Sequence, residues 1–270
     1  MLTNNSLILS KKIRKKTLEM VHKSKASHVG SCFSMADIIS VLYTTVLRIS
    51  PADIKNKNRD RFILSKGHAA AIMYALLGEL DFFPKEELDT YCEDGSRLMG
   101  HISHYVPGVE VSTGSLGHGL PIACGMALAG KADSLDYRVF TLVSDGELDE
   151  GSNWEAILFA PHQKLDNLIL IVDYNKIQSF GTVKDVLDLE PLKSKFESFG
   201  WVVKEIDGHS HKEIEDVFKL IPFNKGKPSV VIAHTVKGKG VSFMEDKLEW
   251  HYKSPNIEQL EKALKELDLQ

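Results

Sequence analysis

Short, continuously apolar segments recur along the chain and alternate with segments whose apolar residues have a helical spacing. The apolar segments are rich in Val and Ile, which predicts strands covered on both faces: 62–65, 139–144, 168–173, 201–206 and 229–234. The helical spacing predicts helices over 34–48, 68–80, 117–132, 151–163, 189–199 and 211–221. This alternation predicts an α/β fold, an open and mostly parallel sheet with helices on both faces.

The chain shows no internal repeat or linker, so we expect one domain over residues 1–270. Ser34, with Asp37 three residues later, matches a capping pattern for the helix that follows. Residues 93–119 are rich in Gly, Ser and His and lack a clear period. A loop this long within a compact domain is usually functional.

Charge and composition narrow the possible partners. The formal net charge of −4 gives no reason to expect a nucleic-acid or membrane surface. The lysine cluster at 11–16 is interpreted as a solvated helix face. No apolar stretch reaches the length of a membrane span, and no signal-peptide core begins the sequence, so we expect a cytoplasmic protein. Three widely spaced cysteines favour neither a disulfide framework nor a cysteine-rich metal site.

Hard oxygen donors follow two of the predicted strands. Asp145 comes directly after 139–144, and Asn175 comes after 168–173. Parallel strands end at one edge of a sheet, where ligands bind, so the two side chains can be neighbours. Carboxylate and amide oxygens suit Mg²⁺ or Ca²⁺. With so few protein ligands, we expect substrate phosphate oxygens to complete the coordination of Mg²⁺. Gly146 would let a phosphate approach the backbone, and a helix beginning near Gly151 would offer free N–H groups.

Other interpretations of these residues remain open at this point. Asp-Gly and Asn are common in plain turns, which would need no metal. A phosphate-loop nucleotide site is disfavoured because the chain lacks GxxxxGK[ST].

The stretch from 144 to 175 resembles the thiamine diphosphate motif, GDG followed about thirty residues later by N. Other segments resemble transketolase: KSKASHVGSCFSMADI, RFILSKGHAAAIMYALL, MGHISHYVPGVEVSTGSLGHGL and IAHTVKGKGVSFME. The resemblance extends to about residue 253 and covers only the diphosphate-binding domain. It therefore implies the N-terminal subunit of a split transketolase, with the pyrimidine and C-terminal domains absent from this chain.

The resemblance assigns the cofactor site by position. It implies that thiamine diphosphate binds with Mg²⁺, for which Ca²⁺ or Mn²⁺ could substitute. Asp145, Asn175 and the carbonyl of Ile177 would hold the metal. Gly146 and His68 would contact the diphosphate.

The remaining cofactor and interface residues follow in the same way. Gly114 and Leu116 match residues that touch the cofactor rings. Glu150 and Glu155 match a glutamate pair at a dimer interface.

The same resemblance implies the catalytic residues. His28 and His251 would move protons during cleavage and transfer, and His101 would bind the C1 hydroxyl of the two-carbon fragment. The residues His22, His162, His209 and His211 are interpreted as ordinary surface or capping residues.

Some positions depart from the family pattern. Ser144 replaces the first glycine of GDG, and His118 stands where many relatives have glutamine. SHVG replaces GHPG and GHISHY replaces GHPE, which leaves His28 and His101 in place but the sugar preference open.

The implied activity is transfer of a two-carbon ketol unit from a ketose phosphate to an aldose phosphate, in the pentose phosphate pathway or in a more specialised route. A separate C-terminal subunit carrying the pyrimidine domain would be needed, most simply in an α₂β₂ heterotetramer. Three alternatives remain: a deoxyxylulose-phosphate synthase, a ketoacid dehydrogenase subunit, and a non-catalytic domain that binds the cofactor only as a scaffold.

Overall fold

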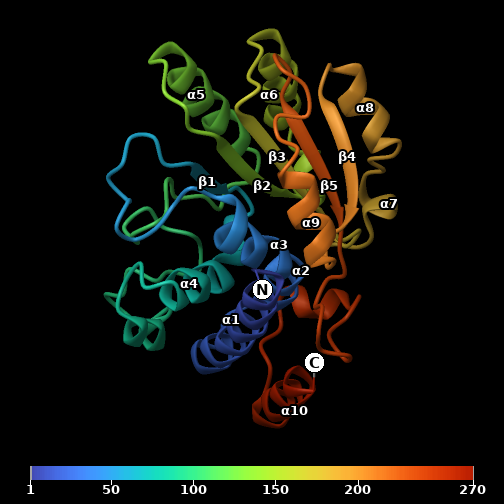
Figure 1. Cartoon of the computed structure of the whole chain (residues 1–270). Coiled ribbons are helices and arrows are strands. Elements are labelled where there is room, and N and C mark those ends of the chain that lie inside the picture. The colour runs from blue at the N-terminus through green and yellow to red at the C-terminus, as the bar shows by residue number, and fades with distance from the viewer. Residues whose placement is uncertain (1, 270) are drawn as a thin grey trace.

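The five predicted strands are all present in the computed structural model, which describes residues 2–269 (Figure 1). Each strand begins and ends within one residue of its prediction. Their bounds are β1 Arg61–Leu64, β2 Val139–Ser144, β3 Leu168–Tyr174, β4 Val202–Asp207 and β5 Ser229–His234.

The strands form one open, entirely parallel sheet in the order β1-β2-β3-β5-β4. β1 and β4 are therefore its edges. β2 and β3 are hydrogen-bonded neighbours, and Ser144 lies opposite Asp173 at their carboxyl ends. This register places the residues that follow the two strands side by side, as predicted.

Apolar side chains on both faces of the sheet bury two cores. Alternate residues of a strand point to opposite faces, so Phe62 and Leu64 join one core and Ile63 joins the other. The first core is covered by α1 (Leu2–Ser24), α2 (Val29–Ser34), α3 (Ala36–Val41), α4 (Ala70–Glu79) and α9 (His211–Phe218). The second is covered by α5 (Gly119–Ala132), α6 (Gly151–His162) and α8 (Leu192–Ser198). The predicted α/β class is confirmed (Figure 1).

The helix predicted over 34–48 has a different start. In the structure α2 ends at Ser34, α3 begins at Ala36 with Met35 as its N-cap, and a π-helical turn follows over Leu42–Val46. The prediction that Ser34 caps this helix is wrong. Its hydroxyl instead donates to the buried Asp173 carboxylate, 2.6 Å away.

The lysine cluster at 11–16 lies on α1, but it is not simply a solvated face. Arg14 is buried and pairs with Asp37 at 2.7 Å. Lys15 pairs with Asp268 of α10 (Ile257–Asp268), which packs against α1. Within residues 2–269, no helix is both long enough and apolar enough to cross a membrane.

The predicted loop lies between α4 and α5. Residues 93–118 form turns and bends, and they bring Gly114 and Leu116 back to the carboxyl end of the sheet. Three 3₁₀ segments carry residues of the site: Gly67–Ala69, Gly146–Asp149 and Leu248–His251. A further 3₁₀ segment, Lys85–Thr90, packs against α4, and the short helix α7, Val183–Val186, follows β3.

Candidate functional site

A cavity of about 230 Å³ opens beyond the carboxyl ends of β2 and β3. It is lined by His28, Ser31, His68, His101, Gly114, Leu116, Ser144, Asp145, Gly146, Asn175, Ile177, Gln178, Ser179, Lys237 and His251. Ten of the twelve residues proposed for catalysis, cofactor and metal are in this set; Glu150 and Glu155 are not. Eight separate stretches of the chain thus meet at one polar pocket, as expected for an open α/β sheet.

Asp145 is a buried carboxylate at the floor of the cavity. It follows β2 directly and is 1% exposed. The Gly146 and Lys176 backbone N–H groups donate to its two oxygens at 2.7 and 2.5 Å. Burial, together with the neighbouring Asp173, raises its pKa to about 7.

These surroundings fit a divalent cation. Among the described residues, no basic side chain forms an ion pair with Asp145, although Lys66 and Lys237 are near enough for their charges to act on it. Asn175 places its amide beside it, with Oδ1 accepting from Ile177 N–H at 3.2 Å. A carboxylate, an amide and a carbonyl all offer hard oxygen donors. Mg²⁺ commonly takes only a few such protein ligands when phosphate oxygens complete its coordination shell.

The Ile177 carbonyl, the third predicted metal ligand, already has a partner. Lys237 donates to it from Nζ at 2.9 Å and also approaches His251 Nδ1 at 3.0 Å. A carbonyl oxygen has two lone pairs, so this contact leaves one for a metal. Because an ammonium group can only donate, Nδ1 of His251 is an acceptor and a neutral ring carries its proton on Nε2.

Four histidines, His28, His68, His101 and His251, also line the cavity. The His28 ring lies 5.1 Å from His68, 5.9 Å from His101 and 5.1 Å from His251, measured between centroids. His28 has a left-handed backbone, with φ of 74°, and its N–H donates to the His251 carbonyl at 2.9 Å. This bond ties the loop before α2 to the 3₁₀ turn Leu248–His251.

Burial keeps three of these rings, those of His28, His68 and His251, neutral. It lowers the pKa of His28 to about 4, with help from His101 and Lys237, and that of His251 to about 3, with help from Lys237. His68 is more deeply enclosed, and burial holds its pKa well below the usual value. A neutral imidazole has a lone pair for a substrate proton, but a pKa lowered this far makes the ring a weaker base than an exposed histidine.

Two buried lysines belong to the site although the sequence interpretation did not assign them. Lys66 pairs with Asp173 at 2.5 Å, with both side chains fully buried, and also donates to the Ser31 carbonyl at 2.8 Å. Burial, followed by the charge of Lys66, lowers the pKa of Lys237 to about 8. The available signal was a lysine within each glycine-containing motif, SKGH and VKGKG.

Glu147 was also missed. It is fully buried and accepts hydrogen bonds from the Ser65 hydroxyl and from Gly117 N–H, the latter at 3.0 Å. Gly117 has φ of 84°, so the turn leading into α5 needs glycine there. Glu147 therefore fixes the loop that carries Gly114 and Leu116 over the cavity.

Glu150 and Glu155 lie outside the cavity. Both are exposed, at the start of α6 and one turn into it. The exposed apolar residues Leu158 and Phe159 follow Glu155 on the same helix.

The fold and the cavity together define the class: an α/β protein with a pocket at the carboxyl edge of a parallel sheet. The pocket is lined by histidines and by oxygen donors that suit a divalent cation. Residues 6–267 match the family described as transketolase, thiamine diphosphate binding domain. The chain belongs to this family.

Similar proteins cover the whole chain. It is 43% identical over 96% of its length to an apulose-4-phosphate transketolase subunit of Phocaeicola vulgatus, covering 92% of that protein. It is 41% identical over 95% of its length to a 6-deoxy-6-sulfo-D-fructose transketolase subunit of a Clostridium species, covering 94% of it. Human transketolase is 38% identical over 95% of this chain, which covers only 41% of it.

Solved transketolase structures share the fold. The enzyme from Leishmania mexicana superposes with a TM-score of 0.91 at 29% identity, over 97% of this chain and 41% of its own. A transketolase from Pichia stipitis in complex with sedoheptulose 7-phosphate gives 0.90 at 28% identity. The chain thus spans about two fifths of these solved chains.

Proposed function

We propose that this chain is one subunit of a transketolase that depends on thiamine diphosphate and Mg²⁺, and that it transfers a two-carbon ketol unit from a ketose phosphate to an aldose phosphate together with a separate C-terminal subunit. The observation that carries the proposal is one cavity lined both by Asp145 and Asn175 and by a cluster of four histidines. We further propose that residues 1–270 form a single domain.

The cofactor end of the cavity suits a metal-bound diphosphate. Asp145, Asn175 and the Ile177 carbonyl would hold Mg²⁺, while Gly146 and His68 would face the phosphates. Lys237, positioned between Ile177 and His251, adds a positive charge to the same region. Gly114 and Leu116 lie on the loop that Glu147 fixes through Gly117, and they would pack against the rings of the cofactor.

The histidine end of the cavity suits a polyhydroxylated substrate. Bound thiamine diphosphate supplies the carbon nucleophile and the electron sink for carbon–carbon cleavage. His28 would accept the C3 hydroxyl proton and return it to the acceptor oxygen, and His251 would support this proton traffic by donating a hydrogen bond from Nε2–H to the reacting oxygen. His101 would bind the C1 hydroxyl of the transferred fragment. A ketoacid dehydrogenase subunit or a cofactor scaffold would have no use for such a cluster.

The need for a second subunit is supported by an exposed apolar surface on α5 and α6. Ile122 and Leu128 are each 37% exposed, and Leu158 is 62% exposed. Glu155 lies one turn from Leu158 on α6, where residues three apart are neighbours. We assign Glu150, Glu155 and this surface to subunit contacts in an α₂β₂ assembly, with the pyrimidine domain supplied by the partner.

Ketol transfer should therefore depend on both subunits. The purified chain, supplied with Mg²⁺, thiamine diphosphate and a panel of ketose phosphates, should show no turnover, and addition of the C-terminal subunit should start it. Coupled aldose release measures the rate, and the C-terminal subunit without this chain is the control. Full turnover by the single chain would refute the split arrangement. A mixture that binds the cofactor but transfers no ketol unit from any donor would refute the activity.

The histidine cluster should titrate far below neutral pH in the free chain. NMR titration of labelled histidines should give midpoints of about 4 for His28 and about 3 for His251, with His28→Asn and His251→Asn used for assignment. Because these folded-state values lie below the unfolded value near 6.5, their contribution to stability is complete above that pH and is lost as the pH falls through 4. A midpoint near 6.5 for either ring would mean that the cavity does not exclude water.

A further inference from the structure

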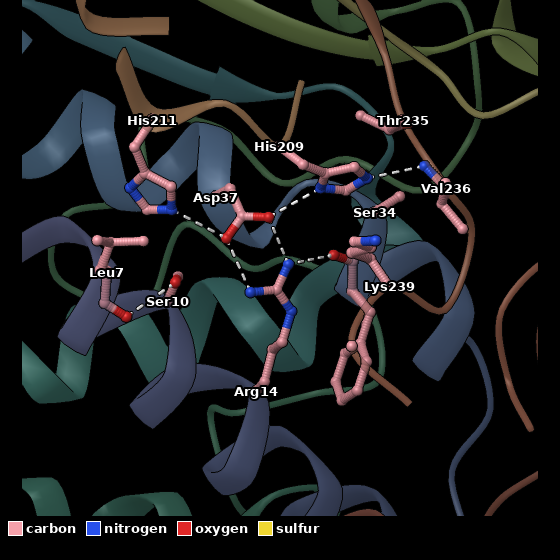
Figure 2. Close-up of polar contacts among 12 residues, drawn as sticks. Leu7, Ser10, Arg14, Ser34, Asp37, His209, His211, Thr235, Val236 and Lys239 are labelled. Carbon is pink, nitrogen blue, oxygen red and sulfur yellow. Dashed lines mark hydrogen bonds and ion pairs between the residues drawn. The ribbon is translucent and has the colours of Figure 1, made fainter. Parts of the chain in front are cut away.

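A second polar cluster, largely buried, joins four separate segments of the chain (Figure 2). Asp37 of α3 is at its centre and is 6% exposed. The Arg14 guanidinium of α1 donates to both carboxylate oxygens, at 2.8 and 2.7 Å. His209, in the turn after β4, and His211, at the start of α9, contact the same carboxylate at 2.8 and 3.1 Å.

The contacts of His209 determine which of its nitrogens carries the proton. The Val236 backbone N–H lies 2.8 Å from Nε2, and a backbone N–H can only donate. Nε2 is therefore the acceptor, and Nδ1 carries the hydrogen that is donated to Asp37 (Figure 2). Although burial opposes ionisation, Arg14 and the two histidines hold the pKa of Asp37 well below its usual value, so the acceptor is an anion.

Val236 connects this cluster to the cavity. It precedes Lys237, whose Nζ contacts the Ile177 carbonyl and His251. The neighbouring amides are fixed too: Thr235 N–H donates to the Tyr174 carbonyl at 3.1 Å, and Gly238 N–H donates to the Gly30 carbonyl at 3.0 Å. At Val236 the corresponding acceptor is the imidazole of His209, a side chain from another segment.

We propose that His209 is a positioning residue for the cofactor site: oriented by Asp37 and Arg14, it accepts the Val236 N–H and thereby fixes the backbone that presents Lys237 to the diphosphate. This inference rests on the proposed function for its diphosphate. The orientation of the loop, however, is a property of the chain alone. His209 touches no reacting atom in this arrangement and acts through Val236 and Lys237.

Two conservative substitutions distinguish the proposed role of His209, acceptance of the Val236 N–H, from simple neutralisation of the Asp37 carboxylate. Glutamine is long enough to place its amide oxygen where Nε2 of His209 lies, so His209→Gln keeps the acceptor for Val236. Asparagine is shorter and reaches only the Nδ1 position, so His209→Asn keeps the donor to Asp37 and loses the acceptor. His211→Asn is the matched control, because it removes another contact to Asp37 without involving Val236.

Hydrogen exchange of the Val236 amide in the free chain is the first readout. We expect His209→Asn to accelerate this exchange about tenfold or more, and His209→Gln and His211→Asn to leave it close to wild type. Calorimetry with thiamine diphosphate, Mg²⁺ and the C-terminal subunit is the second readout. His209→Asn should weaken cofactor binding about tenfold, the usual cost of losing a residue that orients a binding group, and His209→Gln should recover most of that loss.

A different ranking of the variants in the exchange experiment would overturn the inference. If His209→Gln exchanges as fast as His209→Asn, or if His211→Asn has the same effect, the cluster merely neutralises Asp37. Wild-type chain that fails to bind thiamine diphosphate would instead refute the proposed function. In that case the exchange rates at Val236 would still decide whether His209 fixes this loop.

Discussion

Asp145→Asn should weaken the binding of thiamine diphosphate in the presence of Mg²⁺ on the order of a hundredfold or more, because it removes the one anionic ligand proposed for the metal. Ketol transfer by the assembled enzyme should fall in parallel. The Tm of the free chain should change little. Asparagine relieves a buried charge whose pKa is raised to about 7, but it can accept only one of the two backbone hydrogen bonds that Asp145 now accepts.

Calorimetric titration of the cofactor, with and without Mg²⁺, measures this effect. Asp94→Asn is a suitable control, since Asp94 is exposed and is not among the residues that line the cavity. Binding by Asp145→Asn that remains as tight and as Mg²⁺-dependent as in wild type would remove Asp145 from the metal site.

Lys66→Met should reduce the free energy of unfolding by about 3–5 kcal/mol, because it leaves the buried carboxylate of Asp173 without its cation. Burial favours the neutral form of Asp173, yet Lys66 holds the pKa of this carboxyl below its usual value. Adding Asp173→Asn to Lys66→Met should recover a large part of the loss, since an amide can still bond the Ser34 and Thr235 hydroxyls.

Urea unfolding of the free chain gives the three free energies for this comparison. Lys193→Met provides the surface control: Lys193 and Glu205 are 3.7 Å apart and both half-exposed, so its effect should stay below about 1 kcal/mol. A loss from Lys66→Met as small as that of the control, or a double variant no more stable than Lys66→Met, would contradict this account of the pair.

The sheet could be predicted because its strands are buried on both faces. Continuous apolar segments rich in Val and Ile, such as 139–144 and 229–234, predict strands directly. The two strands begin and end at the predicted residues. The start of the helix near Ser34 could not be predicted in this way. A serine followed by an acidic residue looks the same whether its hydroxyl caps a helix or bonds a carboxylate 139 residues away in sequence.

The membership of the cavity could be predicted to a large extent, because eight of the ten assigned residues lie in motifs at strand ends or in the loop that returns to them. The other two, His28 and His251, lie away from strand ends and were assigned from the family resemblance alone. Their roles in catalysis and binding stay predictions. Lys66 and Lys237 were missed because lysine is usually exposed, and only the fold reveals that Asp173, Ile177 and His251 surround these two side chains.

The cluster around Asp37 shows a different limit. Arg14 belongs to a lysine-rich run, and His209 and His211 flank a serine that caps α9, so each has an ordinary local explanation. Their common partner, Asp37, lies on a third segment, and no short-range pattern connects them. Contacts of this kind become visible only once α1, α3 and the turn after β4 are brought together in space.

The two outer strands of the sheet restrict how the chain can associate. β1 is only four residues long and begins with Arg61, and β4 exposes Lys204 and Glu205 near its middle. Short or charged borders discourage a neighbouring polypeptide from extending the sheet by strand addition. Assembly is thereby directed to helical surfaces such as that of α5 and α6, so a companion subunit could dock or depart without rearranging any strand ladder.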